Sequence, residues 1–149
     1  MKRGGARSVL EKETQRQIEA EIGAEPDLLI LRNSVGLAQH INEDDGKVWF
    51  VPYGLGEGSP DLVAMLRVTR SDKYFEKLGP PVPMHLAVWF CIEVKADEGK
   101  PSDEQEKCHR LWRRFGALVY VCRSAKEARE ALEDARERVW LLLESEVAS

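Results

Sequence analysis

The chain contains no apolar run near the roughly 20 residues that a membrane-spanning helix requires. Its basic start, residues 1–7, is not followed by the apolar core of a secretion signal. Cysteine is scarce too, with three residues and no CxxC pair, which disfavours a zinc site and favours reduced core thiols. These absences predict a cytoplasmic protein that has no membrane partner.

Positive charge is also not in excess, because the formal net charge is −4 at pH 7. This argues against a protein that holds nucleic acid by overall charge alone. It does not exclude a nuclease, since a cation site needs local acid. The 149 residues, 43% of them hydrophobic and 32% charged, suit one globular domain. We expect this domain at 8–145, between a flexible basic arm at 1–7 and a tail at 146–149.

Hydrophobic periodicity predicts alternating helices and strands, and therefore an α/β domain with a mixed sheet. A helix is expected at 8–22, where Gly23 and Pro26 end it. Residues 48–51 are either a further strand or one arm of a hairpin, and 69–86 are expected to be a loop insertion. The remaining predicted strands are 28–31, 61–68, 87–95 and 117–123, and the remaining helices are 102–115 and 124–145.

The strand predicted at 87–95 ends in Glu-x-Lys. Strand alternation places Glu93 and Lys95 on one face and Val94 on the other. Charged groups at the end of a buried strand are costly unless something uses them. Asp61 begins a strand that can pair with this one, so its carboxylate and that of Glu93 can converge on one Mg²⁺ or Mn²⁺. The simpler alternative is a surface Glu-Lys pair and a turn aspartate. Trp89 shares the Glu93 face and is expected to pack beneath the site.

Four segments, 54–62, 90–95, 102–105 and 116–124, resemble in order the motifs of the virus-type replication-repair nuclease (VRR-NUC) domain. This family belongs to the PD-(D/E)XK nuclease superfamily. The pairs Glu11 with Gln15 and Arg32-Asn33 with Gly36 resemble its N-terminal motifs. The resemblance implies a restriction-endonuclease-like fold, in which a mixed central sheet flanked by helices forms an αβββαβ core followed by a C-terminal helix.

The resemblance also implies a metal site with Mg²⁺ or Mn²⁺ and no small-molecule cofactor. Its ligands would be Asp61, Glu93 and the backbone carbonyl of Val94, with Glu11 acting through a water and Glu13 as its rival. Lys95 would orient the attacking water or offset charge in the transition state. The expected catalytic residues are therefore Asp61, Glu93, Lys95, Gln105 and Glu11.

Gln105 has two possible roles. It stands three residues after Ser102, the N3 position of a capping box, which is a structural role. The resemblance instead points its side chain toward the active site, and the sequence suggests that the two roles exclude one another. His109, one turn further along, is either a residue of the helix surface or edge, which is the favoured interpretation, or a catalytic base.

Phosphate contacts need cationic or polar side chains. The candidates are Arg32, Asn33, Ser59, Lys100, Arg110 and Arg113. A charged helix face is more often simply solvated, and Ser59 fits a turn before Pro60 equally well. No groove-reading module is recognisable, so cleavage selective for DNA structure is favoured over sequence specificity.

The predicted function is a metal-dependent DNA endonuclease acting on branched DNA, such as a Holliday junction or a flap. The alternatives are a non-cleaving module that binds DNA or protein, and a nuclease for RNA or linear duplex. The last helix leaves one more question open. Its apolar stripe at Ala128, Leu132, Ala135, Val139 and Leu142 fits either packing on the sheet or the seam of a homodimer.

Overall fold

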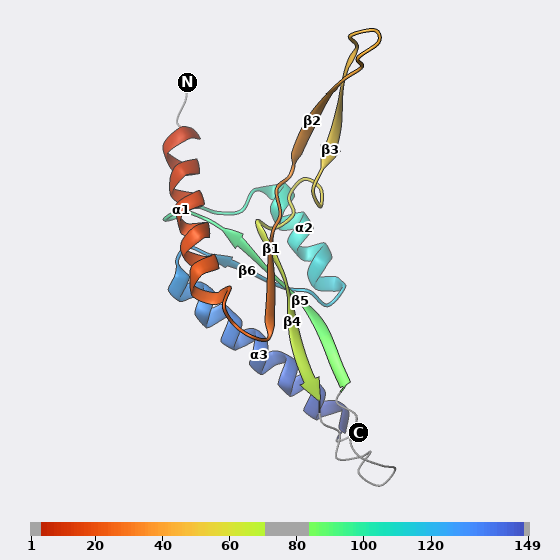
Figure 1. Cartoon of the computed structure of the whole chain (residues 1–149). Helices are drawn as coiled ribbons and strands as arrows, with labels where there is room; N and C mark the ends of the chain where they lie inside the picture. The colour runs from red at the N-terminus through yellow and green to blue at the C-terminus, as the bar shows by residue number, and fades with distance from the viewer. Residues whose placement is uncertain (1–3, 71–83, 148–149) are drawn as a thin grey trace.

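The computed structural model describes residues 4–70 and 84–147, and a four-stranded sheet in the order β1-β4-β5-β6 lies at its centre (Figure 1). β1 (Leu28–Arg32), β4 (Leu62–Arg70) and β5 (Met84–Val94) are antiparallel neighbours. β6 (Leu118–Cys122) runs parallel to β5 after a helical crossover. The predicted α/β class with a mixed sheet is confirmed.

Helices cover both faces of the sheet, because the strand side chains alternate between two apolar clusters. Phe90, Ile92 and Val94 of β5 belong to the cluster packed against α1 (Gly4–Ile22) and α3 (Ala125–Val147). Cys91 belongs to the other cluster, on the side of α2 (Asp103–Arg114). Glu93 therefore faces α2, as its strand position requires.

The apolar stripe of α3 is used inside the protomer. Ala128, Leu132 and Ala135 are fully buried in the cluster shared with α1 and the sheet, and Val139 is 6% exposed. Packing on the sheet therefore accounts for this part of the stripe. The side chain of Leu142, the last residue of the stripe, lies outside the described part of the chain, and a homodimer through this helix stays a prediction.

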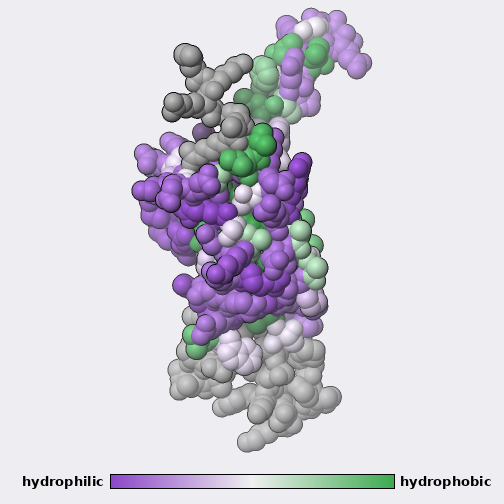
Figure 2. Space-filling model, turned by 90° about the vertical axis from the view of Figure 1, so that its left-hand side faces the viewer, coloured by the Kyte–Doolittle hydropathy of each residue, from purple (hydrophilic) through white to green (hydrophobic). Residues whose placement is uncertain are grey.

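A separate two-stranded sheet extends from the body of the molecule (Figure 1). It consists of β2 (Gly36–Ile41) and β3 (Val48–Tyr53). The sequence predicted only the second arm and missed the first. All six residues of β3 are exposed, and Figure 2 shows apolar side chains among polar ones on this projecting part.

Three predicted boundaries were wrong. The first helix begins at Gly4, so residues 4–7 are helical and not a flexible arm, while 1–3 lie outside the described residues. β4 continues to Arg70 and β5 begins at Met84, so the predicted insertion shrinks to 71–83, also outside them. The last helix reaches Val147, which takes in half of the predicted tail. In the described part of the chain, no helix is long and apolar enough to span a membrane.

Candidate active site

Glu93 lies at the centre of the site with its side chain completely buried. Its Oε1 atom lies 2.6 Å from Nζ of Lys95, which is itself 9% exposed. The Glu-x-Lys motif is therefore a buried ion pair and not the surface pair of the simpler alternative. A buried carboxylate is costly unless it is paired and hydrogen-bonded. The rest of the site depends on how the two oxygens of Glu93 are satisfied.

Asp61 reaches the same place from the residue just before β4. β4 and β5 pair through Leu62 and Ile92, so Asp61 stands one residue beyond the ladder and level with Glu93. Its Oδ2 atom accepts a hydrogen bond of 2.8 Å from the backbone N–H of Val94. Burial and the nearby Glu93 charge raise the pKa of Asp61 to about 6. The two carboxylates thus repel one another, as two anions in one site do.

The backbone of Val94 also faces Asp61. The N–H and C=O of one strand residue point to the same side, and the N–H of Val94 points at Asp61. The backbone of Lys95 bonds to β6, on the opposite side of β5, since its N–H donates to the Cys122 carbonyl at 3.0 Å. Strand geometry therefore directs the Val94 carbonyl toward Asp61.

Gln105 fills both roles that the sequence had suggested were exclusive, so that expectation was wrong. The side-chain Oε1 of Gln105 accepts a hydrogen bond of 2.9 Å from the backbone N–H of Ser102. The backbone N–H of Gln105 donates to Ser102 Oγ at 3.2 Å, which completes the capping box. The amide nitrogen at the other end of the side chain donates to Oε1 of Glu93. An amide carries a donor and an acceptor, so one side chain can cap α2 and hold Glu93 together.

The expected position of His109 was wrong. His109 was expected at the helix surface, but it is 2% exposed and points at Glu93. Its Nε2 lies 3.4 Å from Oε2 of Glu93, and neither atom has a hydrogen-bond partner. The signal available in the sequence was its spacing, four residues after Gln105, which puts both on one helix face.

The structure distinguishes Glu11 from its rival. Glu11, on α1, is among the charges that raise the pKa of Asp61, and its side chain is half-buried. Glu13 is exposed and interacts along its own helix, 3.5 Å from Arg16 and 3.3 Å from the amide of Gln17. Of the two, Glu11 is the carboxylate whose charge contributes to the raised pKa of Asp61.

Asn33 and Ser59 hold the loop that leads to Asp61. The amide of Asn33 donates to Ser59 Oγ at 2.7 Å and to the Pro60 carbonyl at 2.9 Å, and its Oδ1 accepts from the Leu55 N–H at 3.2 Å. Ser59 is 8% exposed and donates to the Gly56 carbonyl at 2.6 Å. Their polar groups are thus already used within the fold, and their expected role as phosphate contacts stays a prediction.

The expected cationic contacts divide into two groups. Arg32 pairs with both carboxylate oxygens of Glu19 on α1, and Arg113 donates to the Val119 carbonyl at 2.6 Å, so both have structural partners. Lys100 is exposed, and Arg110 makes only an exposed pair with Glu106 at 3.6 Å. Lys100 and Arg110 therefore remain available to a polyanion.

The three cysteines are free thiols. Cys91 and Cys122 are buried, as predicted, and burial raises the pKa of each to about 12. Cys108 is only half-buried, which differs from the expectation of a core thiol.

A family model described as the VRR-NUC domain matches residues 39–126, more than half of the chain. The chain belongs to the VRR-NUC family. Membership indicates a nuclease-type function, implies a PD-(D/E)XK-like fold and implies DNA as the substrate. Asp61, Glu93, Lys95 and Gln105 lie within the matched VRR-NUC residues, whereas Glu11 lies before them. No curated protein and no solved structure matches the chain.

The donor set can be tested for its fit to the divalent metal that PD-(D/E)XK-type nucleases generally use. No group of three or more His, Cys, Asp or Glu side chains in the described ranges is spaced to hold a metal. Instead, Asp61 lies close enough to Glu93 for the two charges to interact, the Val94 backbone borders Asp61, and one buried carboxylate oxygen, Oε2 of Glu93, has no hydrogen bond. Hard oxygen donors around excess negative charge fit a cation such as Mg²⁺ or Mn²⁺.

Proposed function

We propose that the protein is a metal-dependent endonuclease that hydrolyses phosphodiester bonds in branched DNA, such as a Holliday junction or a flap. The observation that carries the proposal is the surrounding of Glu93. A fully buried carboxylate has Lys95 and Gln105 on one oxygen, no hydrogen bond on the other, and Asp61 beside it with a raised pKa. Such perturbed, converging groups are typical of functional sites.

In this proposal Asp61, Glu93 and the Val94 carbonyl hold the metal, and Glu11 acts through a water. The metal, when bound, would polarise the scissile phosphate and lower the pKa of a water. The negative charge that raises the pKa of Asp61 supports this arrangement, because a cation would relieve it.

Lys95 and Gln105 act on the reacting groups from the protein side. Lys95 places a positive charge 2.6 Å from Glu93, where it can offset charge that develops on the phosphate. Gln105 fixes the Glu93 carboxylate and is itself fixed by the cap of α2. The chain thereby holds the charged groups in place before substrate arrives.

The proposed catalytic core consists of α1, β1, β4, β5, α2 and β6, which gives the order αβββαβ when the β2–β3 hairpin is set aside. Asp61 precedes the second of these strands, and Glu93 and Lys95 lie at and just after the end of the third. This order supports the restriction-endonuclease-like core that the resemblance implied.

The proposal is tested by incubating purified protein with a Holliday junction, a flap and a linear duplex in Mg²⁺, Mn²⁺ or EDTA. Glu93→Gln and Lys95→Met should abolish cleavage, since each keeps the size of the side chain and removes its charge. Glu98→Gln and Lys126→Met change exposed side chains of the same types and should cut at the wild-type rate. Circular dichroism and thermal melting show whether each variant is folded.

Cleavage of branched DNA that needs a divalent metal and fails in both site variants is the expected result. Branched DNA cut equally well by folded Glu93→Gln would overturn the assignment of that residue. Binding without cleavage under every metal condition would favour a non-cleaving module. Faster cutting of RNA or linear duplex would replace the proposed substrate.

A further inference from the structure

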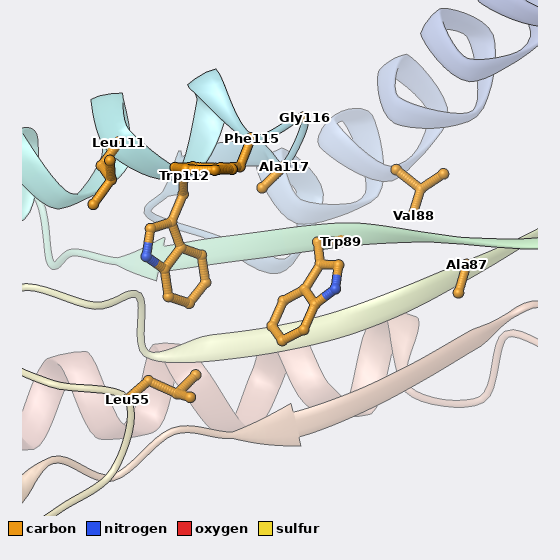
Figure 3. Close-up of a pocket in the computed structure, with 9 residues that line it drawn as sticks. All are labelled: Leu55, Ala87, Val88, Trp89, Leu111, Trp112, Phe115, Gly116 and Ala117. Carbon is orange, nitrogen blue, oxygen red and sulfur yellow. The ribbon is translucent and has the colours of Figure 1, made fainter.

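An aromatic groove lies on the α2 side of the sheet, with a volume of about 470 Å³. We define it by five of its lining residues, Leu55, Trp89, Leu111, Trp112 and Phe115. Figure 3 shows the indoles of Trp89 and Trp112 next to one another, with Trp89 projecting from β5 and Trp112 from α2. Their centroids are 5.8 Å apart and their planes meet at 89°. The volume is that of a small-molecule site.

The groove leaves large apolar side chains open to water. Trp89 is 47% exposed, Leu111 49% and Phe115 85%, which contradicts the expectation that Trp89 packs beneath the site. Single exposed apolar residues are ordinary, but a contiguous set around a hollow marks a binding surface. Its occupant must therefore present a flat or apolar surface.

Every element that lines the aromatic groove also carries a residue of the candidate active site. Trp89 lies on the Glu93 face of β5, four residues earlier and about 13 Å away along the strand. Trp112 lies on α2, as do Gln105 and His109. The aromatic groove and the proposed active site therefore lie on the same face of the sheet and are built from the same elements.

The loop between β3 and β4 also connects the aromatic groove with the proposed active site, since it carries Leu55 and leads to Asp61. Its backbone N–H is held by Asn33, whose amide also holds the loop at Pro60. One anchored loop therefore borders both the aromatic groove and the proposed active site.

The surrounding charge identifies the kind of occupant. Besides Arg113, which is held by the Val119 carbonyl, the second half of α2 carries three exposed cations near these apolar side chains: Lys107, Arg110 and Arg114. A nucleotide combines the two features that match such a surface, an anionic phosphate and a flat base that stacks on aromatic rings.

We propose that the aromatic groove binds an unpaired base of the DNA substrate, on the same face of the sheet as the bond that is cut. The inference rests on the proposed function and deepens it. Bases inside a duplex are stacked and paired, so only a base in a single-stranded arm enters the groove without an unstacking cost. The groove thereby supplies a physical reason for preferring flaps and branches over linear duplex.

The test distinguishes binding that depends on the base from binding that depends on the phosphates. Two flap substrates share one duplex and one arm length, but one arm carries thymines and the other abasic residues with the same phosphates. Affinities are measured by fluorescence anisotropy in EDTA, where binding is observed without cutting. Wild type should bind the thymine arm about 5- to 150-fold more tightly, as stacking of one base predicts.

Trp89→Ala should bind the two arms equally. Trp89→Leu, which keeps apolar packing but removes the ring, should do the same. Trp140→Ala is the matched control, since Trp140 on α3 is 55% exposed and lies outside the aromatic groove. This control should keep the wild-type preference for thymine. Thermal melting of each variant shows that the fold is retained.

Equal affinity of wild type for thymine and abasic arms would overturn the inference, and so would a thymine preference that survives in Trp89→Leu. A change in molecular mass on Trp89 substitution, without loss of base dependence, would assign the groove to a second copy of the chain. Base-dependent binding without any cleavage would sink the proposed nuclease activity and leave the groove assignment standing. Cleavage without base dependence would do the reverse.

Discussion

Nε2 of His109 and Oε2 of Glu93 face one another at 3.4 Å inside the protein, and neither makes a hydrogen bond. Unpaired buried polar atoms are rare because each forfeits its interaction with water. Here the two lie at the one place where a cation is proposed to bind. The relationship suggests that His109 lines the position that Oε2 of Glu93 offers to a ligand.

Replacing His109 therefore tests how Oε2 is satisfied. His109→Phe keeps a ring in the pocket but replaces the polar atom 3.4 Å from that carboxylate oxygen by apolar surface, and complete desolvation of a buried polar group costs about 1–3 kcal/mol. The free energy of unfolding in EDTA should fall by that amount, and by less in Mg²⁺, where a bound cation would offset the loss. His109→Gln, which restores an N–H donor, should recover most of the stability. Equal losses with and without Mg²⁺ would contradict this account.

The double role of Gln105 can be separated by two substitutions. Ser102→Ala removes the side-chain half of the cap and should cost about 1 kcal/mol of stability, with cleavage unchanged. Gln105→Glu keeps an oxygen for the N–H of Ser102 but sets a second carboxylate against Glu93. Cleavage should then fall about 100-fold, the usual effect of losing a fixed hydrogen-bond donor. Urea unfolding and single-turnover cleavage measure the two effects. The separation fails if Ser102→Ala loses as much activity as Gln105→Glu.

Much of the central site was predictable from the sequence because it depends on short-range rules. Strand alternation placed Glu93 and Lys95 on one face, and Asp61 stands at the start of the neighbouring strand as expected. The capping spacing located the start of α2. These features follow from periods of two and of three to four residues.

What could not be predicted depends on long-range packing. His109 stands between Cys108 and Arg110 and looks like a surface residue until β5 is laid against α2. Asn33 was recognised as part of a motif, but its bond to Ser59 joins residues 26 positions apart, which no local pattern reveals. β2 (Gly36–Ile41) was missed because it pairs only with β3, so its residues show no buried face.

Two glycines in the loop before Asp61 provide a matched pair. Both Gly56 and Gly58 have positive φ, at 96° and 79°, so alanine strains the backbone at either position. A Cβ at Gly56 would meet nothing within 4 Å, but one at Gly58 would lie 2.7 Å from the Glu104 carbonyl oxygen. Only Gly58 therefore needs to be small as well as flexible.

Gly56→Ala should cost about 1–2 kcal/mol and leave cleavage unchanged. Gly58→Ala should cost more, and cleavage should fall about 100-fold, because the loop must move away from α2 and take Asp61 with it. Thermal melting and single-turnover rates compare the pair. Similar rates in both variants would mean that the loop does not position Asp61.

The raised pKa of Asp61 predicts how stability depends on pH. The folded-state pKa is about 6 and the model value is 3.8, so between pH 4 and 6 the folded protein holds a proton that the unfolded chain releases. Stability of the metal-free protein should therefore decrease as pH rises through this range. The loss should reach about 2 kcal/mol, since the carboxyl is partly open to water.

Asp61→Asn removes the charge and can still accept the N–H of Val94. In EDTA this variant should match wild type near pH 4 and exceed it near pH 7, while in Mg²⁺ the advantage should shrink because wild type then gains binding energy. Urea unfolding from pH 4 to 7 measures the difference. Asp97→Asn alters an exposed carboxyl in the loop after β5 and should leave the wild-type pH dependence intact. Parallel stability curves for Asp61→Asn and wild type would show that this carboxylate is not strained by its neighbours, and the electrostatic argument for a cation beside Glu93 would fail with it.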